Sequence, residues 1–289
     1  MKQKVFVTGL SSSLLQQIVG YLPLDKFEIL ALTRKNHPEP QEGVTWLHGS
    51  LETIGLLEEN LAGISFIIHG AAVTHTPDIG EYFRINYEAT KNLVDISNRI
   101  GGVKFIYISS RAAVPGSGGY GESKLKAEEY VRTNCKSWIV YKPSEIYGGM
   151  KNEGIESLIQ DALSKTVQIY PGGESLMYPV SLEDTSKLIY EYSFEKGHWN
   201  QTLIVNGTEA YSYKSLIELV SKITGKSKIL LPIPKFIMYF IQWVISNTGL
   251  KISIVPDQID RFYAPKPIGH IDFPYESIAA YIRKLAKGQ

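Results

Sequence analysis

The sequence is poor in cysteine and carries no excess of either charge. Cys135 is its single cysteine in 289 residues, which excludes an internal disulfide framework and a metal site built from cysteines. The six histidines show no ligand spacing such as His-x-x-x-His, so we predict no metal site. Lysine and arginine number 30 against 29 aspartates and glutamates, and this balance excludes a strongly electrostatic nucleic-acid binder. A hydrophobic share of 44% is typical of a globular chain.

Long apolar runs are also missing. The most apolar stretch, Phe236 to Ile245, has nine apolar residues of ten and falls well short of the ~20 residues that cross a membrane. We expect a core or subunit-contact helix there and keep membrane-surface contact as the less favoured alternative. At the N-terminus, Met1 to Lys4 pass directly into Val5 without an apolar leader, which predicts a cytoplasmic protein with no membrane span.

Short apolar runs alternate with helical patterns in the first half of the chain. Such alternation is typical of βαβ units, and therefore of a parallel sheet covered on both faces. We predict an α/β fold: a Rossmann-like doubly wound parallel sheet with a smaller C-terminal, mostly helical substrate lobe. The expected dinucleotide-binding domain covers residues 1–149 and the lobe residues 150–289, with room for strands of the lobe to return to the first sheet. The expected strands include residues 5–7, 29–32, 66–68, 103–108 and 139–141.

A short glycine-containing turn follows the first expected strand. Three glycines at such a turn would let the backbone approach a pyrophosphate at the start of a helix. Here Gly9 is present, whereas Ser12 and Leu15 stand at the other two positions. An ordinary strand-to-helix turn with serine caps is the alternative. As cofactor-binding residues in this turn we predict Gly9, Ser11, Ser12, Ser13 and Leu14.

The second expected strand ends in a basic pair. An acidic residue at this place would bind the ribose hydroxyls of NAD, but the chain has Arg34 and Lys35. Positive charge suits the 2′-phosphate of NADP, so the predicted cofactor is NADP or NAD with NADP slightly favoured, and Arg34 is a predicted contact. The alternative is a solvated basic pair at a strand end.

The strongest chemical signal lies between residues 105 and 124. Ser110 ends a buried strand, and Tyr120 and Lys124 are four residues apart, hence on one face of a helix. A lysine beside a phenol favours the phenolate and lowers its pKa. The tyrosine can then exchange a proton with an alcohol or carbonyl that the serine holds.

With these residues the chain resembles the extended short-chain dehydrogenase/reductases, also called NAD-dependent epimerase/dehydratases, although its glycine loop is degenerate. The resemblance covers most of the chain. It rests on Thr8-Gly9, His69-Gly70-Ala71-Ala72, the Asn-x-x-x-Thr-x-Asn helix from Asn86, Lys142-Pro143 to Tyr147-Gly148, Tyr178 to Asp184, and Val205-Asn206-Gly207.

The resemblance implies a role for several further residues. Ser110, Tyr120 and Lys124 would be the catalytic triad, and Asn86 would support a proton relay or serve the structure alone. A homodimer is implied through the helices at residues 86–100 and 120–134. The implied cofactor contacts are Ser50, Leu51, Gly70, Ala71, Ala72, Lys124, Pro143 and Ile146.

Two departures from the family pattern stand out beside the degenerate glycine loop. Ser50 replaces an aspartate that usually meets the adenine. The connection from Arg111 to Gly119 is short and rich in glycine, which predicts a flexible loop over the active site.

These observations favour an NAD(P)-dependent epimerase, dehydrogenase or reductase that acts on a hydroxyl or ketone. A nucleotide sugar is the preferred small-molecule substrate. The altered glycine turn motivates an alternative, a non-catalytic NAD(P)-binding regulator or assembly subunit on the same fold. The complete set of Ser110, Tyr120 and Lys124 argues for the enzyme.

Overall fold

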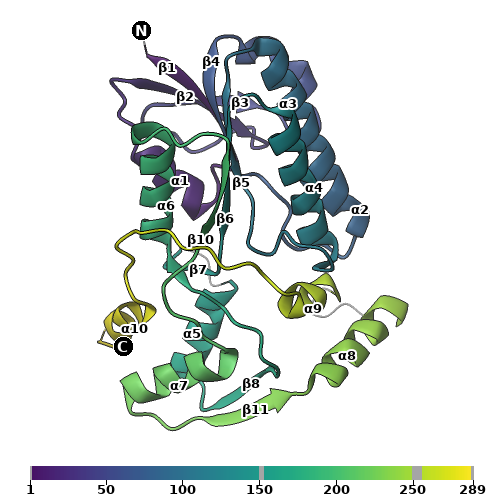
Figure 1. Cartoon of the computed structure of the whole chain (residues 1–289), viewed down its shortest axis with the longest axis vertical. Coiled ribbons are helices and arrows are strands. Elements are labelled where there is room, and N and C mark those ends of the chain that lie inside the picture. The colour runs from purple at the N-terminus through teal and green to yellow at the C-terminus, as the bar shows by residue number, and fades with distance from the viewer. Residues whose placement is uncertain (1, 150–152, 249–255, 288–289) are drawn as a thin grey trace.

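A seven-stranded, fully parallel sheet forms the centre of the molecule (Figure 1). The computed structural model describes residues 2–149, 153–248 and 256–287. The strand order reverses at β1, which pairs with β2 on one side and β4 on the other, as expected for a doubly wound sheet. Across the sheet the strands are β10 (Gln201–Val205), β6 (Trp138–Pro143), β5 (Lys104–Ile108), β4 (Ile64–His69), β1 (Gln3–Thr8), β2 (Phe27–Thr33) and β3 (Val44–His48).

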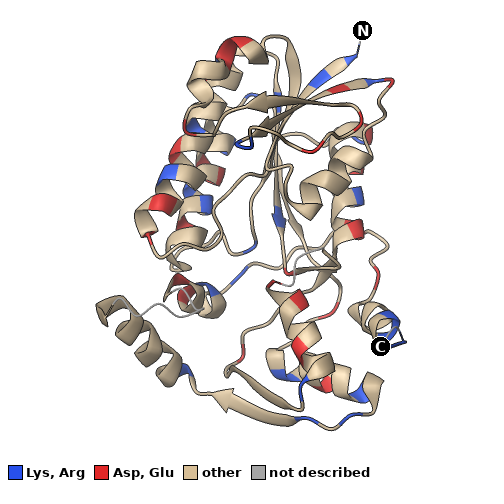
Figure 2. Ribbon diagram, turned by 180° about the vertical axis from the view of Figure 1, so that it is seen from behind, with Lys and Arg blue, Asp and Glu red and all other residues tan. Residues whose placement is uncertain are grey.

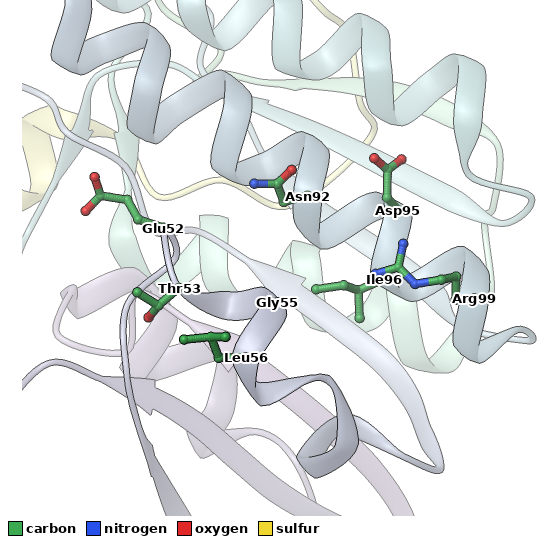
Figure 3. Close-up of a pocket in the computed structure, with 8 residues that line it drawn as sticks. All are labelled: Glu52, Thr53, Gly55, Leu56, Asn92, Asp95, Ile96 and Arg99. Atoms are coloured by element: carbon green, nitrogen blue, oxygen red, sulfur yellow. The ribbon is translucent and has the colours of Figure 1, made fainter.

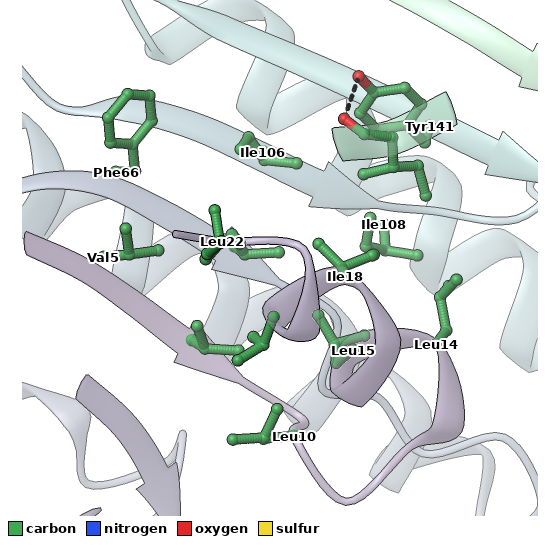
Figure 4. Packing of buried hydrophobic residues seen from close by; sticks show 14 of the residues in the cluster. Val5, Leu10, Leu14, Leu15, Ile18, Leu22, Phe66, Ile106, Ile108 and Tyr141 are labelled. Carbon is green, nitrogen blue, oxygen red and sulfur yellow. Dashed lines mark hydrogen bonds between the residues drawn. The ribbon is translucent and has the colours of Figure 1, made fainter. Parts of the chain in front are cut away.

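Helices cover both faces of this sheet, and the alternation of side chains along β1 shows why. Val5 and Val7 point to one face and pack with α1 and α6, as Figure 4 shows for part of this cluster. Phe6 points to the opposite face and packs with η1, α3 and α4. The first face carries α1 (Ser13–Gly20) and α6 (Leu182–Tyr190). The second carries the 3-10 helix η1 (Ile54–Leu61), α2 (Ile79–Tyr82), the π-helical turn η2 (Phe83–Glu88), α3 (Ala89–Ile100) and α4 (Gly118–Asn134).

A smaller lobe, with its own apolar cluster, lies below the carboxyl ends of the strands. Ile159, Leu216 and Ile282 are fully buried there, on three different helices. Strand β10 leaves the lobe and returns to the main sheet beside β6. The π-helical turn η3 (Glu191–Glu195) continues α6 and packs against the core of the main sheet. The lobe contains β7 (Ile146–Tyr147), α5 (Ile155–Ser164), β8 (Val167–Pro171), β9 (Val180–Ser181), α7 (Tyr213–Thr224), β11 (Ile229–Ile233), α8 (Lys235–Thr248), α9 (Pro256–Tyr263) and α10 (Ile278–Lys287).

The structure confirms the Rossmann-like fold, and it corrects one expectation. The apolar run at residues 236–245 forms α8, which projects from the lobe and is not a core helix (Figure 1). Phe236, Phe240 and Trp243 are 74%, 62% and 60% exposed. An apolar run alone does not reveal whether protein covers it, and that is why the sequence misled. None of the helices in the described ranges is long and apolar enough to cross a membrane.

Candidate active site

The β1–α1 turn lies at the carboxyl edge of the sheet, where the strand order reverses. Gly9 has a φ of +85°, and a Cβ there would lie 2.6 Å from the backbone nitrogen of Ala71. The absence of a side chain therefore lets the turn press against the segment that leaves β4. Leu15 is accommodated in the same way, because its side chain fills the space where Gly70 would carry a Cβ. Because Gly70 has no side chain, there is room for Leu15, which stands where the glycine pattern has its third glycine.

The predicted phosphate-binding residues form this turn and the start of α1. Ser12 is the N-cap of the helix, and its hydroxyl accepts a hydrogen bond from the Leu15 amide at 3.3 Å. The side chain of Leu14 is buried in the core, which leaves its backbone for contact with a ligand. First-turn amides have no acceptor within their own helix, and at a strand-order reversal they suit a pyrophosphate. The turn from Gly9 through Ser11 and Ser13 therefore fits a dinucleotide.

Arg34 and Ser50 each lie just beyond the end of a strand, and the two strands, β2 and β3, are neighbours in the sheet. Arg34 follows β2, is exposed, and makes no ion pair with any residue that the structure describes. Ser50 follows β3, and its hydroxyl lies 3.1 Å from the Thr53 hydroxyl, so it closes its own turn. Leu51 is buried beside it. The charge of Arg34, like that of the exposed Lys35 beside it, is therefore available to a phosphate at this edge.

A buried chain of neutral hydrogen bonds runs beneath the turn. Thr8 Oγ1 lies 2.6 Å from His69 Nδ1, and His69 Nε2 lies 2.7 Å from Thr90 Oγ1. The Thr90 hydroxyl donates to the carbonyl of Asn86, so it must accept from Nε2–H, and Nδ1 in turn accepts from Thr8. Burial, together with the positive charge of Lys124, lowers the pKa of His69 to about 3. The imidazole is neutral, with its proton on Nε2.

Asn86 continues this chain toward the catalytic helix. It lies in the π-helical turn η2; its Oδ1 accepts from the Val73 amide at 2.8 Å, and its Nδ2 donates to the Val73 carbonyl at 3.0 Å. The same Nδ2 donates to Ser123 Oγ, whose hydroxyl donates to the carbonyl of Tyr120. All three contacts hold neighbouring segments in place. They indicate a positioning role for Asn86.

Ser110 and Tyr120 are brought together as the sequence predicts. Ser110 follows β5, and Tyr120 lies in the first turn of α4. Burial raises the pKa of the Tyr120 phenol, while the charge of Arg261 and a hydrogen bond with the Ser110 side chain lower it and Asp257 raises it. The phenol therefore stays protonated at neutral pH and can act as a general acid.

Lys124 lies one helical turn beyond Tyr120, but its ammonium group has other partners. Its Nζ donates to the carbonyl of Ile108 at 2.7 Å and lies 4.2 Å from the centre of the Tyr107 ring. Burial lowers the pKa of Lys124 to about 7. Within the described residues no hydrogen bond joins it to Tyr120. The sequence predicted the shared helix face, and side-chain torsions then direct the ammonium toward β5.

The cation beside the catalytic phenol comes instead from α9. The guanidinium carbon of Arg261 lies 4.5 Å from the centre of the Tyr120 ring, and its nitrogens donate to the carbonyl of Thr74 at 3.4 Å. Asp257, on the same helix, accepts from the Tyr82 hydroxyl at 3.0 Å and from the Tyr120 amide at 3.4 Å. Sequence reasoning missed both α9 residues. Their four-residue spacing indicates only an ion pair on a helix and gives no sign of a partner elsewhere in the chain.

Several glycines at the connection between β5 and α4 are closely packed, whereas Gly116 meets no neighbour within 4 Å, and the flexible loop stays a prediction. A Cβ at Gly121 would lie 2.3 Å from the Ala112 carbonyl, and one at Gly118 would lie 2.8 Å from the Asp257 Cβ. Arg111 is 2% exposed and its Nη2 donates to both carboxylate oxygens of Glu145 at 3.0 Å. These glycines serve close approach, a role that composition alone does not separate from flexibility.

The remaining predicted contacts lie at adjacent strand ends. Pro143 ends β6, is buried, and its carbonyl accepts from the Arg111 amide at 2.9 Å. Ile146 lies in β7 and packs against the main core. The chain then passes over the start of α1, since a Cβ at Gly149 would lie 3.7 Å from Ser13 Oγ. Gly70, Ala71 and Ala72 leave β4 beside Gly9, so the predicted contacts line one edge of the sheet.

A separate hollow of about 370 Å³ lies between η1 and α3 (Figure 3). Its lining includes Asn92, Asp95 and Arg99 and contains none of the predicted site residues. No group of histidine, cysteine and carboxylate side chains within the described ranges could hold a metal ion. The edge of the sheet around Tyr120 therefore carries the candidate chemistry.

Comparison with known proteins gives a matching family and two curated relatives. A family model described as the NmrA-like family matches residues 1–255. A ceramide reductase of Caulobacter vibrioides is 28% identical over 148 residues, a match that covers 50% of this chain and 46% of that protein, about half of each. A chloroplastic divinyl chlorophyllide a 8-vinyl-reductase of Arabidopsis thaliana is 20% identical over 294 residues and covers 93% of this chain and 70% of that protein.

Solved structures show the same fold. The structure of gox2253 is 19% identical with a TM-score of 0.74, over 98% of this chain and 96% of that one. A Thermus thermophilus UDP-glucose 4-epimerase in complex with NAD is 18% identical with a TM-score of 0.65, over 80% of this chain and 86% of that one. The family match and these folds confirm the resemblance to the extended short-chain dehydrogenase/reductases.

Proposed function

The chain belongs to the NmrA-like family, and we propose that it is an NAD(P)-dependent oxidoreductase that interconverts a ketone and a hydroxyl group. One observation carries the proposal. The Ser110 side chain lies beside the Tyr120 phenol, whose pKa it lowers, at the sheet edge that also holds the β1–α1 turn. An acid–base pair beside a dinucleotide-shaped turn is the arrangement that hydride-transfer chemistry requires.

In the reducing direction the phenol of Tyr120 donates its proton to the ketone oxygen. Burial keeps the phenol protonated, and the Ser110 hydroxyl orients the same oxygen. A bound NAD(P)H would supply the hydride to the carbonyl carbon. In the oxidising direction Tyr120 must first lose its proton, and the positive charge of Arg261, 4.5 Å from the ring, favours that loss.

The proposed cofactor contacts are the turn at Gly9 to Leu14, the basic end of β2, the Ser50–Leu51 turn, the small residues after β4, and Lys124, Pro143 and Ile146. Within this set Arg34 supports a preference for NADP, because its charge is not neutralised by any described side chain. The Thermus epimerase contains NAD. The choice between NAD and NADP is therefore a property to measure on this chain.

The preferred substrate class is a nucleotide sugar, and the UDP-glucose 4-epimerase among the solved structures supports it. Return of hydride to the opposite face of the ketone would make the reaction an epimerisation. A second class, an apolar ketone, is favoured by a different observation. The exposed apolar residues of α8 belong to a helix that packs against α9, which carries Arg261. The name of the ceramide reductase is consistent with that class.

A non-catalytic NAD(P)-binding regulator is the alternative function. Its support is the ammonium of Lys124, which is bound to the Ile108 carbonyl and carries a pKa of about 7. A lysine held in this way contributes less positive charge to the phenol than the sequence pattern suggests.

Two measurements test the proposal. Thermal-shift titration with NADP and NAD comes first, since a ligand stabilises the fold by an amount that grows with the logarithm of its concentration over its dissociation constant. NADPH oxidation is then followed with a keto nucleotide sugar and with a long-chain amino ketone. Tyr120→Phe should lower kcat by ~10²-fold or more while leaving the dinucleotide shift unchanged.

Clear outcomes separate the functions. Turnover that Tyr120→Phe abolishes supports the oxidoreductase, and the active substrate decides between the two classes. A dinucleotide shift without turnover on either ketone favours the regulator. No thermal shift with either dinucleotide would exclude both the oxidoreductase and the NAD(P)-binding regulator.

A further inference from the structure

The outer face of the β8–β11 ribbon is apolar and exposed. The strands pair in parallel register, with Val167 opposite Ile229 and Ile169 opposite Leu231. Side chains alternate along a strand, so these four point to the same side, and they are between 45% and 68% exposed. The intervening Gln168 is buried against the lobe. Four aliphatic side chains on a two-stranded ribbon form a face that no other described element covers.

Helix α8 follows the ribbon in the chain and carries a second exposed apolar surface. Phe236, Phe240 and Trp243 follow helical spacing and form an exposed stripe, with Phe240 and Trp243 stacked at 6.0 Å between ring centres. Met238 and Ile245 point the other way and are buried. The ribbon and the helix are joined directly, because β11 ends at Ile233 and α8 begins at Lys235. We refer to the exposed residues of β8, β11 and α8 as the apolar face.

The stretch of chain that forms β11 and α8 carries only positive charge. No aspartate or glutamate occurs between Glu218 and Asp257, although acidic and basic residues are balanced in the whole chain. Lysines border the ribbon and the start of the helix, and in Figure 2 the ribbon of the projecting helix has no segment in the colour of acidic residues. The lysines of this acid-free stretch that the structure describes are Lys222, Lys226, Lys228 and Lys235.

We infer that the apolar face docks on the surface of an anionic lipid bilayer. Exposed aromatic and aliphatic side chains enter the boundary between headgroups and acyl chains, and bordering lysines attract anionic headgroups. Helix α8 has 14 residues and does not qualify as a membrane span, so it lies on the bilayer. This reverses the order of the two alternatives that the apolar run left open.

Charge argues against a second copy of the chain as the occupant. A two-fold contact places the same surface on both sides, so the lysines of one copy would face those of the other. The acid-free stretch offers no aspartate or glutamate to neutralise them. The exposed side chains of α3 and α4, where the resemblance implies a homodimer, include Glu122, Lys126 and Glu129 and carry both signs. A bilayer with anionic headgroups supplies the charge that the apolar face lacks.

Side-chain contacts through α9 connect the apolar face to the candidate active site. Gln242 on α8 donates to Asp260 on α9 at 2.6 Å, and the rings of Tyr239 and Tyr263 stack at 5.7 Å. Helix α9 also carries Arg261 against Tyr120. Docking therefore brings α9, and with it the contact of Arg261 with Tyr120, close to lipid. The importance of this placement for catalysis rests on the proposed function.

Vesicle co-sedimentation tests docking without any turnover or dinucleotide. The full chain is mixed with vesicles of phosphatidylcholine alone and with vesicles of equal parts phosphatidylcholine and phosphatidylglycerol. We expect binding to the mixed vesicles, weaker binding to the neutral ones, and loss of binding as salt rises.

Matched variants locate the contact. The double variant Phe240→Glu/Trp243→Glu should lower affinity for the mixed vesicles at least ~tenfold, and Lys226→Glu/Lys228→Glu should lower it mainly at low salt. Leu56→Glu is the apolar control, since Leu56 is 84% exposed on η1, and Lys126→Glu on α4 is the charge control. Both controls should bind as the unmodified chain does. Circular dichroism confirms that each variant is folded.

Several results would overturn the inference. These are no binding to either vesicle, equal binding by the double variant, and equal loss in the Leu56→Glu control. Sedimentation velocity without lipid adds a further one: a dimer that Phe240→Glu/Trp243→Glu converts to monomer would assign the apolar face to self-association.

Discussion

The two sides of the candidate site are built from different interactions. The nucleotide side, around the β1–α1 turn, is joined by neutral hydrogen bonds through Thr8, His69 and Thr90. The catalytic side, around the start of α4, is surrounded by buried charges. Arg111 pairs with Glu145 at 3.0 Å, and Lys142 pairs with Glu128 at 2.8 Å.

This difference determines which properties a substitution on each side should change. A neutral network costs little to bury when every member has a partner, as the chain through His69 does. A buried charge that loses its partner is expensive, and its effect reaches nearby titratable groups. We therefore expect substitutions on the catalytic side to alter stability and proton transfer together. Substitutions on the nucleotide side should change how stability depends on pH, or change the preference between NADP and NAD.

The largest expected effect is on the catalytic side, at Asp257. Asp257→Ala removes the acceptor for the Tyr82 hydroxyl and the Tyr120 amide, both in buried surroundings. We expect the free energy of unfolding to fall by about 4 kcal/mol, measured by urea denaturation at neutral pH. Asp257→Asn keeps an oxygen for Tyr82 and should lose less. Equal losses in the two variants would contradict this account of the α9 contact.

Gly121 tests the close packing at the entrance to α4. In Gly121→Ala the new Cβ would lie 2.3 Å from the Ala112 carbonyl, so the connection must shift. We expect a loss of about 3 kcal/mol, seen as a melting temperature several degrees lower by calorimetry. Gly20→Ala in α1 is the control, because a Cβ there meets nothing within 4 Å. A flexible connection would absorb the methyl group, and both variants would then melt alike.

His69 tests the neutral side through pH. Its pKa in the folded protein is about 3, against an ordinary value of 6.5, so between these pH values the unfolded chain binds a proton that the folded chain does not. Stability is therefore lost as pH falls below 6.5, by about 2 kcal/mol from this group between pH 7 and pH 5. In His69→Gln the same measurement by urea denaturation should show a flatter slope. An unchanged slope would show that His69 is not kept neutral by its surroundings.

Arg34 tests cofactor choice on the nucleotide side. Arg34→Ala removes the exposed charge at the end of β2 and should weaken NADP binding about tenfold while sparing NAD. Thermal-shift titration with both dinucleotides measures the ratio. Lys35→Ala is the neighbouring control. Equal weakening of both dinucleotides would indicate a charge effect that does not recognise the 2′-phosphate.

Arg261 is expected to give the smallest change, seen in a pH profile. Loss of its charge in Arg261→Gln should raise the pKa of Tyr120 further, because the guanidinium lowers it in the folded protein. The alkaline limb of the reduction rate then moves to higher pH, and oxidation at fixed pH slows. Arg261→Lys should restore the profile. If the glutamine and lysine variants share one profile, Arg261 acts through the Thr74 tether rather than through charge.

The sequence predicted those parts of the molecule that local patterns encode. The run at residues 29–32 lies within β2, and that at 103–108 contains β5. The placement of Ser110 beside Tyr120 follows from a strand end and a helix start close together in the chain. Local spacing sufficed in each case because neighbours in the chain set the geometry.

Other features depend on contacts between distant residues. Asp257 meets the Tyr120 amide although 137 positions separate them, and no spacing signals such a pair. The direction of the Lys124 ammonium depends on torsions that a four-residue interval leaves open. Leu15 departed from the glycine pattern, and its accommodation required knowing that Gly70 lies against it. Such relations become visible once the sheet has brought the segments together.

The contact between α9 and α4 also has a consequence for the order of events during synthesis. The seven-stranded sheet needs residues only as far as Val205, where β10 ends. Asp257 and Arg261 leave the ribosome later, and until then the amide and the ring of Tyr120 lack their partners. The scaffold can therefore close before its acid–base group is set. Tyr120 gains its contacts with Asp257 and Arg261 only after α9 has docked on α4.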